Sequence, residues 1–194
     1  VDNTLQVNNA PSGSGTEEYI VGIWENGFAH SSDISVNGNV FENLPGGLPS
    51  ANRQQAFLVT SHSRAGATVS YDSNQVIGAF QGIVWLSTTP TPPDYSGNQP
   101  VVLANSTLRN VDTGILIRHS GSASITGVTL IEGGTTGIRV EDSGSTVSFG
   151  STTTLQGQSG QYITLQNGAM DDSIVDATSV VFRDGSGTPV SDNF

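Results

Sequence analysis

Apolar residues recur in short alternating stretches, most regularly in the second half of the chain. Three of these stretches align with one another, at residues 113–121, 136–144 and 161–168. In each, apolar and polar residues alternate, as expected of a strand with one buried side. Matching Ile115 to Ile138 gives a spacing of 23 positions, and matching Ile138 to Ile163 gives 25. A period of about 20–30 residues built from short strands indicates a solenoid.

The pattern continues upstream in a weaker form. Pairs of apolar residues there match Ile115/Ile117 of the later repeat, namely Ile83/Trp85, Phe57/Val59 and Val21/Ile23. The wider spacings upstream are explained by two insertions rich in proline or glycine, near residues 44–54 and 87–100. Long segments with this composition are typical of loops.

Two further apolar patches follow each of these first strands. The second patches are Ile34/Val36, Val69/Tyr71, Ala123/Ile125 and Val147/Phe149. The third patches are Val40/Phe41, Val76/Ile77, Leu103/Leu108, Val128/Leu130, Leu155 and Val180/Phe182. One such coil cannot bury its apolar side alone, whereas coils stacked about 4.8 Å apart form inward ladders of like residues. We therefore predict an all-β protein: a right-handed single-stranded parallel β-helix of about six coils, with residues 1–194 as one domain.

The form T-G-I-x-(I/V)-x-x-S-G at Thr113–Gly121 and Thr136–Gly144 resembles the repeat of the pectate-lyase-like superfamily of parallel β-helix proteins. The resemblance extends from about Val21 to Phe182. It implies the fold, but that superfamily includes polysaccharide lyases, glycoside hydrolases, epimerases, phage tailspikes and non-catalytic surface proteins. The fold alone does not choose among these functions.

The charge of the chain is one-sided. It has 17 acidic residues against six basic ones, all of them arginine, so the net charge is −11. Such a surface repels phosphate backbones and anionic lipids, which argues against nucleic-acid and membrane-surface partners. No apolar run is long enough to span a bilayer. There is no cysteine and no leader-like segment after Val1. We expect a mature product or a piece of a larger extracellular or cell-surface protein with flanking domains.

The repeat brings one set of candidate catalytic residues together. Aligning the coils places Arg118 next to Glu141, and His119 next to Asp142. An arginine opposed to a carboxylate on an exposed strand face can orient a uronate or assist proton transfer. The structural alternative is an exposed ion pair between coils, which contributes about 0–1 kcal/mol. We favour this alternative.

Aromatic residues give a second set of candidates, for ligand binding. Trp24 can stack on a sugar ring, with Glu25 bonding its hydroxyls, in a polar group that also contains His30 and Asp33. Packing at the end of the β-helix is the favoured alternative for Trp24. Tyr95 lies in the proline-rich insertion, where long loops often carry function.

Other motifs give no site. Asp171-Asp172 is similar to the paired carboxylates of inverting polygalacturonase-like hydrolases, but the accompanying Gly-His-Gly and Arg-Ile-Lys motifs are missing, and a solvated turn is favoured. The three histidines fall in different coils, so we predict no histidine metal site. An acidic surface can attract calcium, but no calcium motif supports it, and we predict no cofactor.

The sequence favours a non-catalytic structural or adhesive β-helical segment, with polysaccharide or a cell-surface glycan as a candidate partner. The alternative is a polysaccharide lyase, hydrolase or epimerase that uses Arg118, His119, Glu141 and Asp142. A trimeric, tailspike-like receptor binder is a lesser hypothesis, because outward positions such as Leu116 and Leu86 provide only a patchy apolar stripe.

Overall fold

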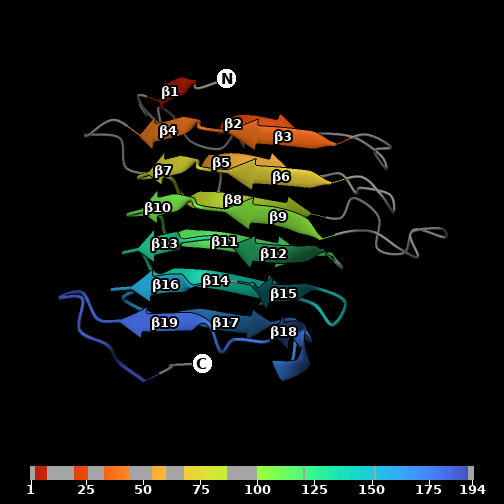
Figure 1. Cartoon of the computed structure of the whole chain (residues 1–194), viewed down its shortest axis with the longest axis vertical. Helices are drawn as coiled ribbons and strands as arrows, with labels where there is room; N and C mark the ends of the chain where they lie inside the picture. Colours follow the sequence, from red (N-terminus) through yellow and green to blue (C-terminus); the bar gives the residue numbers. More distant parts are fainter. Residues whose placement is uncertain are drawn as a thin grey trace, which may run out of the picture.

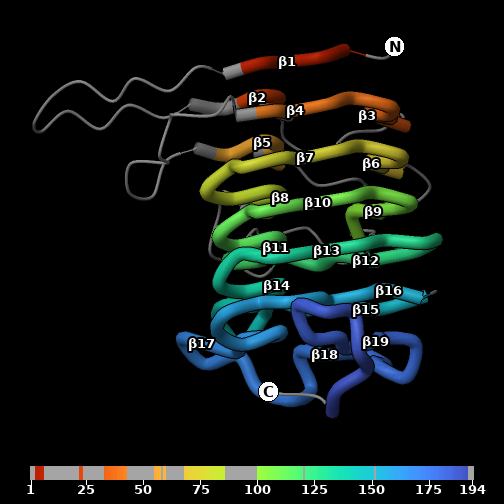
Figure 2. The backbone as a smooth tube through the Cα atoms, turned by 90° about the vertical axis from the view of Figure 1, so that its left-hand side faces the viewer, coloured from red at the N-terminus to blue at the C-terminus, as the bar shows by residue number. Residues whose placement is uncertain are grey.

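The computed structural model shows short strands stacked as successive coils along one axis (Figure 1). The residues that the structure describes are 3–7, 20–25, 33–43, 54–59, 68–86, 100–119, 121–150 and 152–191. The N-terminal strand lies at one end of the stack and the last strands at the other (Figure 2). The predicted insertions near 44–54 and 87–100 fall almost wholly outside the described residues.

Each coil contributes one strand to each of three parallel sheets. Sheet I consists of β2 (Ile20–Glu25), β5 (Gln54–Val59), β8 (Gln81–Leu86), β11 (Thr113–Arg118), β14 (Thr136–Glu141) and β17 (Ile163–Gln166). Sheet II consists of β3 (Ile34–Asn37), β6 (Val69–Asp72), β9 (Val101–Ala104), β12 (Ser122–Thr126), β15 (Thr146–Phe149) and β18 (Ile174–Val175). Sheet III consists of β1 (Thr4–Val7), β4 (Val40–Asn43), β7 (Gln75–Ile77), β10 (Thr107–Arg109), β13 (Thr129–Glu132), β16 (Thr153–Gln156) and β19 (Val180–Arg183). This is the predicted parallel β-helix.

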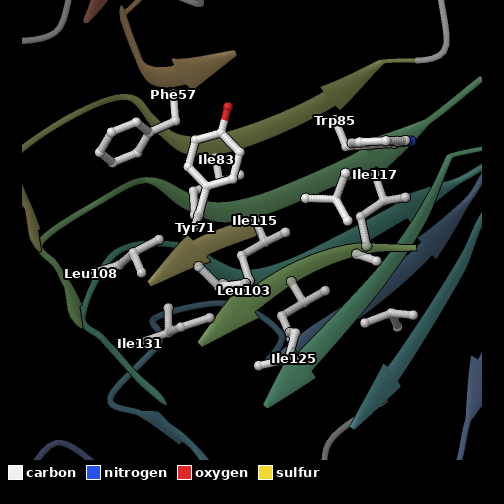
Figure 3. Close-up of a cluster of buried hydrophobic side chains, with 14 of the residues drawn as sticks. Phe57, Tyr71, Ile83, Trp85, Leu103, Leu108, Ile115, Ile117, Ile125 and Ile131 are labelled. Carbon is white, nitrogen blue, oxygen red and sulfur yellow. The ribbon is translucent and has the colours of Figure 1, made fainter. Parts of the chain in front are cut away.

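The inward ladders of the first strands are confirmed. Ile115 pairs with Ile138, and Ile138 with Ile163. Upstream, Ile83 pairs with Ile115, and Phe57 with Ile83. All five side chains are buried, and Figure 3 shows Phe57, Ile83 and Ile115 among the packed core residues. Stacking like on like buries each coil against its neighbours, which is how a solenoid forms its core.

A column of small residues precedes this ladder and explains the conserved form of the repeat within the chain. Gly82, Gly114 and Gly137 occupy the same position in successive strands of sheet I. A Cβ atom added to Gly114 would lie 2.5 Å from the carbonyl oxygen of Gly137 and 2.6 Å from the Cγ2 atom of Ile131. The backbones approach so closely here that a larger residue would push the coils apart.

The first coil departs from the predicted register by two residues. Ile23 pairs with Phe57 and Val21 pairs with Gln55. The prediction that Val21 matches Phe57 is therefore wrong. The correct alignment continues the small-residue column, because Gly22 then lies beside Ala56. Alternation alone does not distinguish registers that differ by two, since both put the same residues on the inner side.

Two third-strand predictions are also wrong. Leu103 belongs to sheet II, where it pairs with Ile125, so the long insertion lies between the first and second strands of its coil. In the next coil Ile131, rather than Leu130, pairs with Leu155 and is buried. Val128 is 76% exposed. The inward position therefore falls one residue later than predicted.

The first four turns from sheet II to sheet III are short and uniform. Gly38, Ser73, Asn105 and Gly127 all have positive φ angles, between 47° and 68°. Inside these turns the Asn39 Nδ2 atom donates a hydrogen bond to Asn74 Oδ1 at 3.1 Å. Buried polar groups of successive coils therefore satisfy one another, as the interior requires.

The C-terminal end of sheet III is closed by a tight turn. After β19 the chain reverses, and Arg183 forms an antiparallel bridge with Pro189. The Asp184 carboxylate accepts hydrogen bonds from the Ser186 hydroxyl at 2.7 Å and from the Thr188 N–H at 2.9 Å. The final coil therefore carries a hairpin held by one aspartate.

Candidate functional site

The outer side of sheet I gathers the predicted candidate residues at its C-terminal half. Ile117 pairs with Val140, so Arg118 lies beside Glu141 in the next coil, as predicted. Arg139 lies between Leu116 and Thr164 on the same outer side. Arg118, Arg139 and Glu141 are half-buried. Since neighbouring strands lie about 4.8 Å apart, these side chains form one polar patch.

Within the described residues, neither arginine of this patch forms a hydrogen bond or an ion pair through its side chain. Among the described residues no ion pair joins Arg118 to Glu141. The Nε atoms of Arg118 and Arg139 are buried and have no hydrogen-bond partner. The expected bond between coils is therefore not formed here, although the two side chains are neighbours.

The turn after the patch is organised by Asp142. His119, Asp142 and Asn167 occupy one column with positive φ angles of 58°, 68° and 55°. The Asp142 Oδ2 atom accepts a hydrogen bond from the His119 N–H. Its Oδ1 atom accepts one from the Ser145 hydroxyl at 3.0 Å. Both carboxylate oxygens hold the turn, which explains an aspartate here without invoking catalysis.

The other predicted sites are not assembled within the described residues. Trp24 and Glu25 are placed in β2, but their side chains, like Tyr95 and His30, lie outside the described part. Asp33 accepts a hydrogen bond from the Thr68 N–H at 2.8 Å. Asp171 and Asp172 are exposed in a short 3-10 helix, Asp171–Ser173, in agreement with the predicted solvated turn.

An ion pair that the sequence analysis did not predict lies on sheet III. The Arg109 Nε atom lies 3.0 Å from Glu132 Oε2, in adjacent strands β10 and β13. Their spacing of 23 residues equals that of Arg118 and Glu141, so the repeat period contained the signal. The pair was not predicted because both residues lie in third strands, where the inward apolar residue was assigned incorrectly.

The outer side of sheet I changes character toward the N-terminus. Val84 and Leu116 point away from the core ladder, yet they are only 0% and 2% exposed. The polar patch lies next to these buried residues, and because its side chains are partly exposed, a ligand in solution can reach it. Among the described residues no helix is long and apolar enough to cross a membrane.

Two cavities lie away from the patch. One, of about 20 Å³, is inside the β-helix between Tyr71, Trp85 and Ile117. The other, of about 200 Å³, lies at the N-terminal end between β1 and the first coil, near Leu5, Phe41 and Phe57. Neither is lined by a predicted catalytic residue.

Three parallel sheets with one strand of each per coil define the class of single-stranded parallel β-helix proteins. A family model described as "Periplasmic copper-binding protein (NosD)" matches residues 1–176. The chain belongs to the NosD family, a family of right-handed, pectate-lyase-like β-helices. No curated protein and no solved structure matches the chain.

The donor groups of the described residues do not fit a copper site. Copper is held in proteins by thiolate, thioether and imidazole ligands. The chain has no cysteine, one methionine and three histidines. Within the described part, His119 and Met170 are the only such donors, both are exposed, and they follow β11 and β17, two coils apart. No group of three His, Cys, Asp or Glu residues gathers in that part of the chain.

Proposed function

We propose that the chain is a non-catalytic, extracytoplasmic β-helical protein that binds an extended glycan along the outer side of sheet I. The observation that carries the proposal is the polar patch on successive strands of one regular sheet. Arg118 on β11, Arg139 and Glu141 on β14, and Thr164 and Gln166 on β17 supply hydrogen-bonding groups at the spacing of the strands. An elongated polymer can contact such a repeating surface at several points.

An extracytoplasmic location is supported by the family description, which names a periplasmic protein. The sequence favours the same side of the membrane for a turn-rich acidic solenoid. Copper, which that description also names, is not part of the proposal, because the donor groups that the structure describes are too few and too far apart.

The absence of catalysis is argued from the chemistry of the candidate groups. Arginine stays protonated at any physiological pH and is a poor general base. The Asp142 carboxylate already accepts hydrogen bonds from its own turn and from His119. Glu141 is the remaining carboxylate of the patch, and a glycosidase usually needs two.

The second candidate function is a polysaccharide lyase, hydrolase or epimerase. It is favoured by the adjacency of Arg118, Glu141, His119 and Asp142 at one corner of sheet I. In that case the double variant Glu141→Gln with His119→Ala should lose activity while remaining folded.

The test compares turnover with binding. Purified protein is incubated with a panel of acidic and neutral polysaccharides, and new reducing ends, unsaturated products and epimerised residues are measured. In parallel, calorimetry measures binding of matched oligosaccharides. We expect binding without turnover. Turnover of any panel member would contradict the non-catalytic role, and failure of every oligosaccharide to bind would contradict the glycan-binding role.

A further inference from the structure

The described arginines divide into two groups. Arg109 is paired with Glu132 at 3.0 Å, and the Arg183 Nη1 atom donates a hydrogen bond to the Gly187 carbonyl oxygen at 2.7 Å. Arg118 and Arg139 have no such partner among the described residues. In a chain with net charge −11, two adjacent arginines whose side chains form no hydrogen bond or ion pair with a described residue are unusual, because carboxylates to pair with them are plentiful.

The two free guanidinium groups belong to one surface. Arg139 is opposite Leu116, which is two residues before Arg118 on the same side of β11. Their backbones are therefore one strand apart, about 4.8 Å, and two residues apart along the strand, about 6.6 Å. Their Nε atoms are covered while the residues as a whole stay partly exposed. Among the described residues, the Nη atoms of the two arginines are not found with the buried polar atoms that lack a partner, so the ends of the guanidinium groups are the parts that a ligand can contact.

From this arrangement we infer that the patch takes an oxyanion-bearing glycan, with one carboxylate or sulfate group at each of Arg118 and Arg139. This rests on the glycan-binding role proposed above. Guanidinium binds a pair of oxygen atoms of an oxyanion through two parallel hydrogen bonds, which gives both strength and orientation. Glu141 beside Arg118 and Thr164 beside Arg139 are placed to bond sugar hydroxyls between the two anionic groups.

The net charge of the protein limits the form of this glycan. A long, densely charged polyanion is repelled by the other acidic side chains, including Glu141 and Asp142 at the patch itself. Contacts at the two arginines act at short range, within the screening distance of about 8 Å at physiological salt. Short acidic oligosaccharides should therefore bind better per residue than long polymers.

The test uses calorimetry of the whole chain with four probes of equal length: a galacturonate oligomer, a sulfated oligosaccharide, a neutral galactose oligomer and a polyphosphate. The variants are Arg118→Gln, Arg139→Gln and the double variant. Arg109→Gln is the matched control, because it removes the same charge from sheet III. The thermal midpoint of each variant shows whether it is folded.

We expect the acidic oligosaccharides to bind better than the neutral one, and each patch variant to weaken them by roughly tenfold or more. Arg109→Gln should stay within about twofold to threefold, as expected for a remote, screened charge. Whichever acidic probe binds more tightly identifies the anion.

Three results would overturn the inference. Equal binding of neutral and acidic oligosaccharides, unaffected by the arginine variants, removes the anion requirement but leaves the proposed glycan-binding role intact. Tighter binding of polyphosphate than of any glycan assigns the arginines to phosphate instead. An equal loss in Arg109→Gln shows a general effect of charge and no local site. If no oligosaccharide binds, the proposed function itself fails.

Discussion

Two arginine–glutamate neighbours occur at the same spacing on different sheets, and only one of them forms an ion pair. On sheet III, Arg109 meets Glu132, which also accepts a hydrogen bond from the Gln156 amide at 3.5 Å. On sheet I, Arg118 lies beside Glu141 without an ion pair. The strand register makes both pairs neighbours, but the surroundings decide contact. Glu132 is fixed between two coils, whereas the Nε atom of Arg118 is covered.

The largest expected effect comes from disrupting the buried ladder of sheet I, on which the stacking of the coils depends. Ile138→Asp places an unpaired carboxylate in the buried ladder between Ile115 and Ile163. Burial of such a charge should cost roughly 4–5 kcal/mol or more and unfold the surrounding coils. Thermal unfolding followed by circular dichroism measures this. Thr164→Asp on the outer side is the control, and equal melting temperatures for the two variants would refute the inward assignment.

A smaller effect is expected where the coils approach most closely. Gly114→Ala would force the Cβ atom against the Gly137 carbonyl oxygen and the Ile131 side chain. We expect a loss of about 1–3 kcal/mol from this overpacking. It should also shift β11 against β14, and so disturb Arg118 and its neighbours more than the ion pair on sheet III.

The control for that variant is Gly185→Ala, because no atom lies within 4 Å of a Cβ added there. Chemical denaturation of both variants gives the two free energies. A Gly114→Ala protein as stable as the Gly185→Ala protein would show that the small-residue column does not set the distance between coils.

Double-mutant cycles measure the coupling energy of each arginine–glutamate pair and so the difference between the two pairs. For Arg109→Gln with Glu132→Gln we expect a coupling energy of about 0.2–1 kcal/mol, as for other exposed pairs. For Arg118→Gln with Glu141→Gln the coupling should be close to zero, since no ion pair forms. Equal couplings in the two cycles would contradict the difference seen between the sheets.

The smallest expected effect concerns the Asp184 carboxylate, which accepts its hydrogen bonds from a hydroxyl group and from backbone N–H groups. Hydrogen bonds from the Ser186 hydroxyl and the Thr188 N–H lower the pKa of Asp184 below its ordinary value of 3.8. A lowered pKa in the folded state means that the carboxylate stabilises the hairpin above the unfolded pKa. This contribution is lost as the pH falls from 3.8 through the folded value.

Hydrogen exchange of the Val190 N–H, which donates to the Phe182 carbonyl oxygen, reports on the hairpin. We expect its protection to fall on acidification in the natural chain. In Asp184→Asn this dependence on pH should disappear. An unchanged acid response in the variant would assign the effect to other groups.

The fold was predictable where identical chemistry repeats at a constant period. The strands at 115, 138 and 163 align because each stacks an aliphatic residue on its neighbour. The predicted register of the first coil was wrong by two residues, because alternation does not detect a shift of two. The small residues Gly22 and Ala56, which lie side by side, would have indicated the correct register. Steric closeness between backbones was therefore a better marker of register than hydrophobicity.

The candidate site was predictable only as a set of neighbours. The period places Arg118 beside Glu141, but it does not show whether the charges meet. The role of Asp142 in its turn depends on a positive φ angle and on hydrogen bonds that no spacing reveals. The freedom of Arg139 also required the structure, since its Nε burial depends on neighbouring side chains.

The corners of the coil differ in how much chain they accept. The turns after β3, β6, β9 and β12 each use two residues, whereas the connections after β2, β5 and β8 are longer and unequal. Lengthening a connection costs little entropy, about 0.6 kcal/mol per doubling, provided that the core is untouched. This corner is therefore a natural grafting point, where a foreign peptide can be displayed without re-engineering the scaffold.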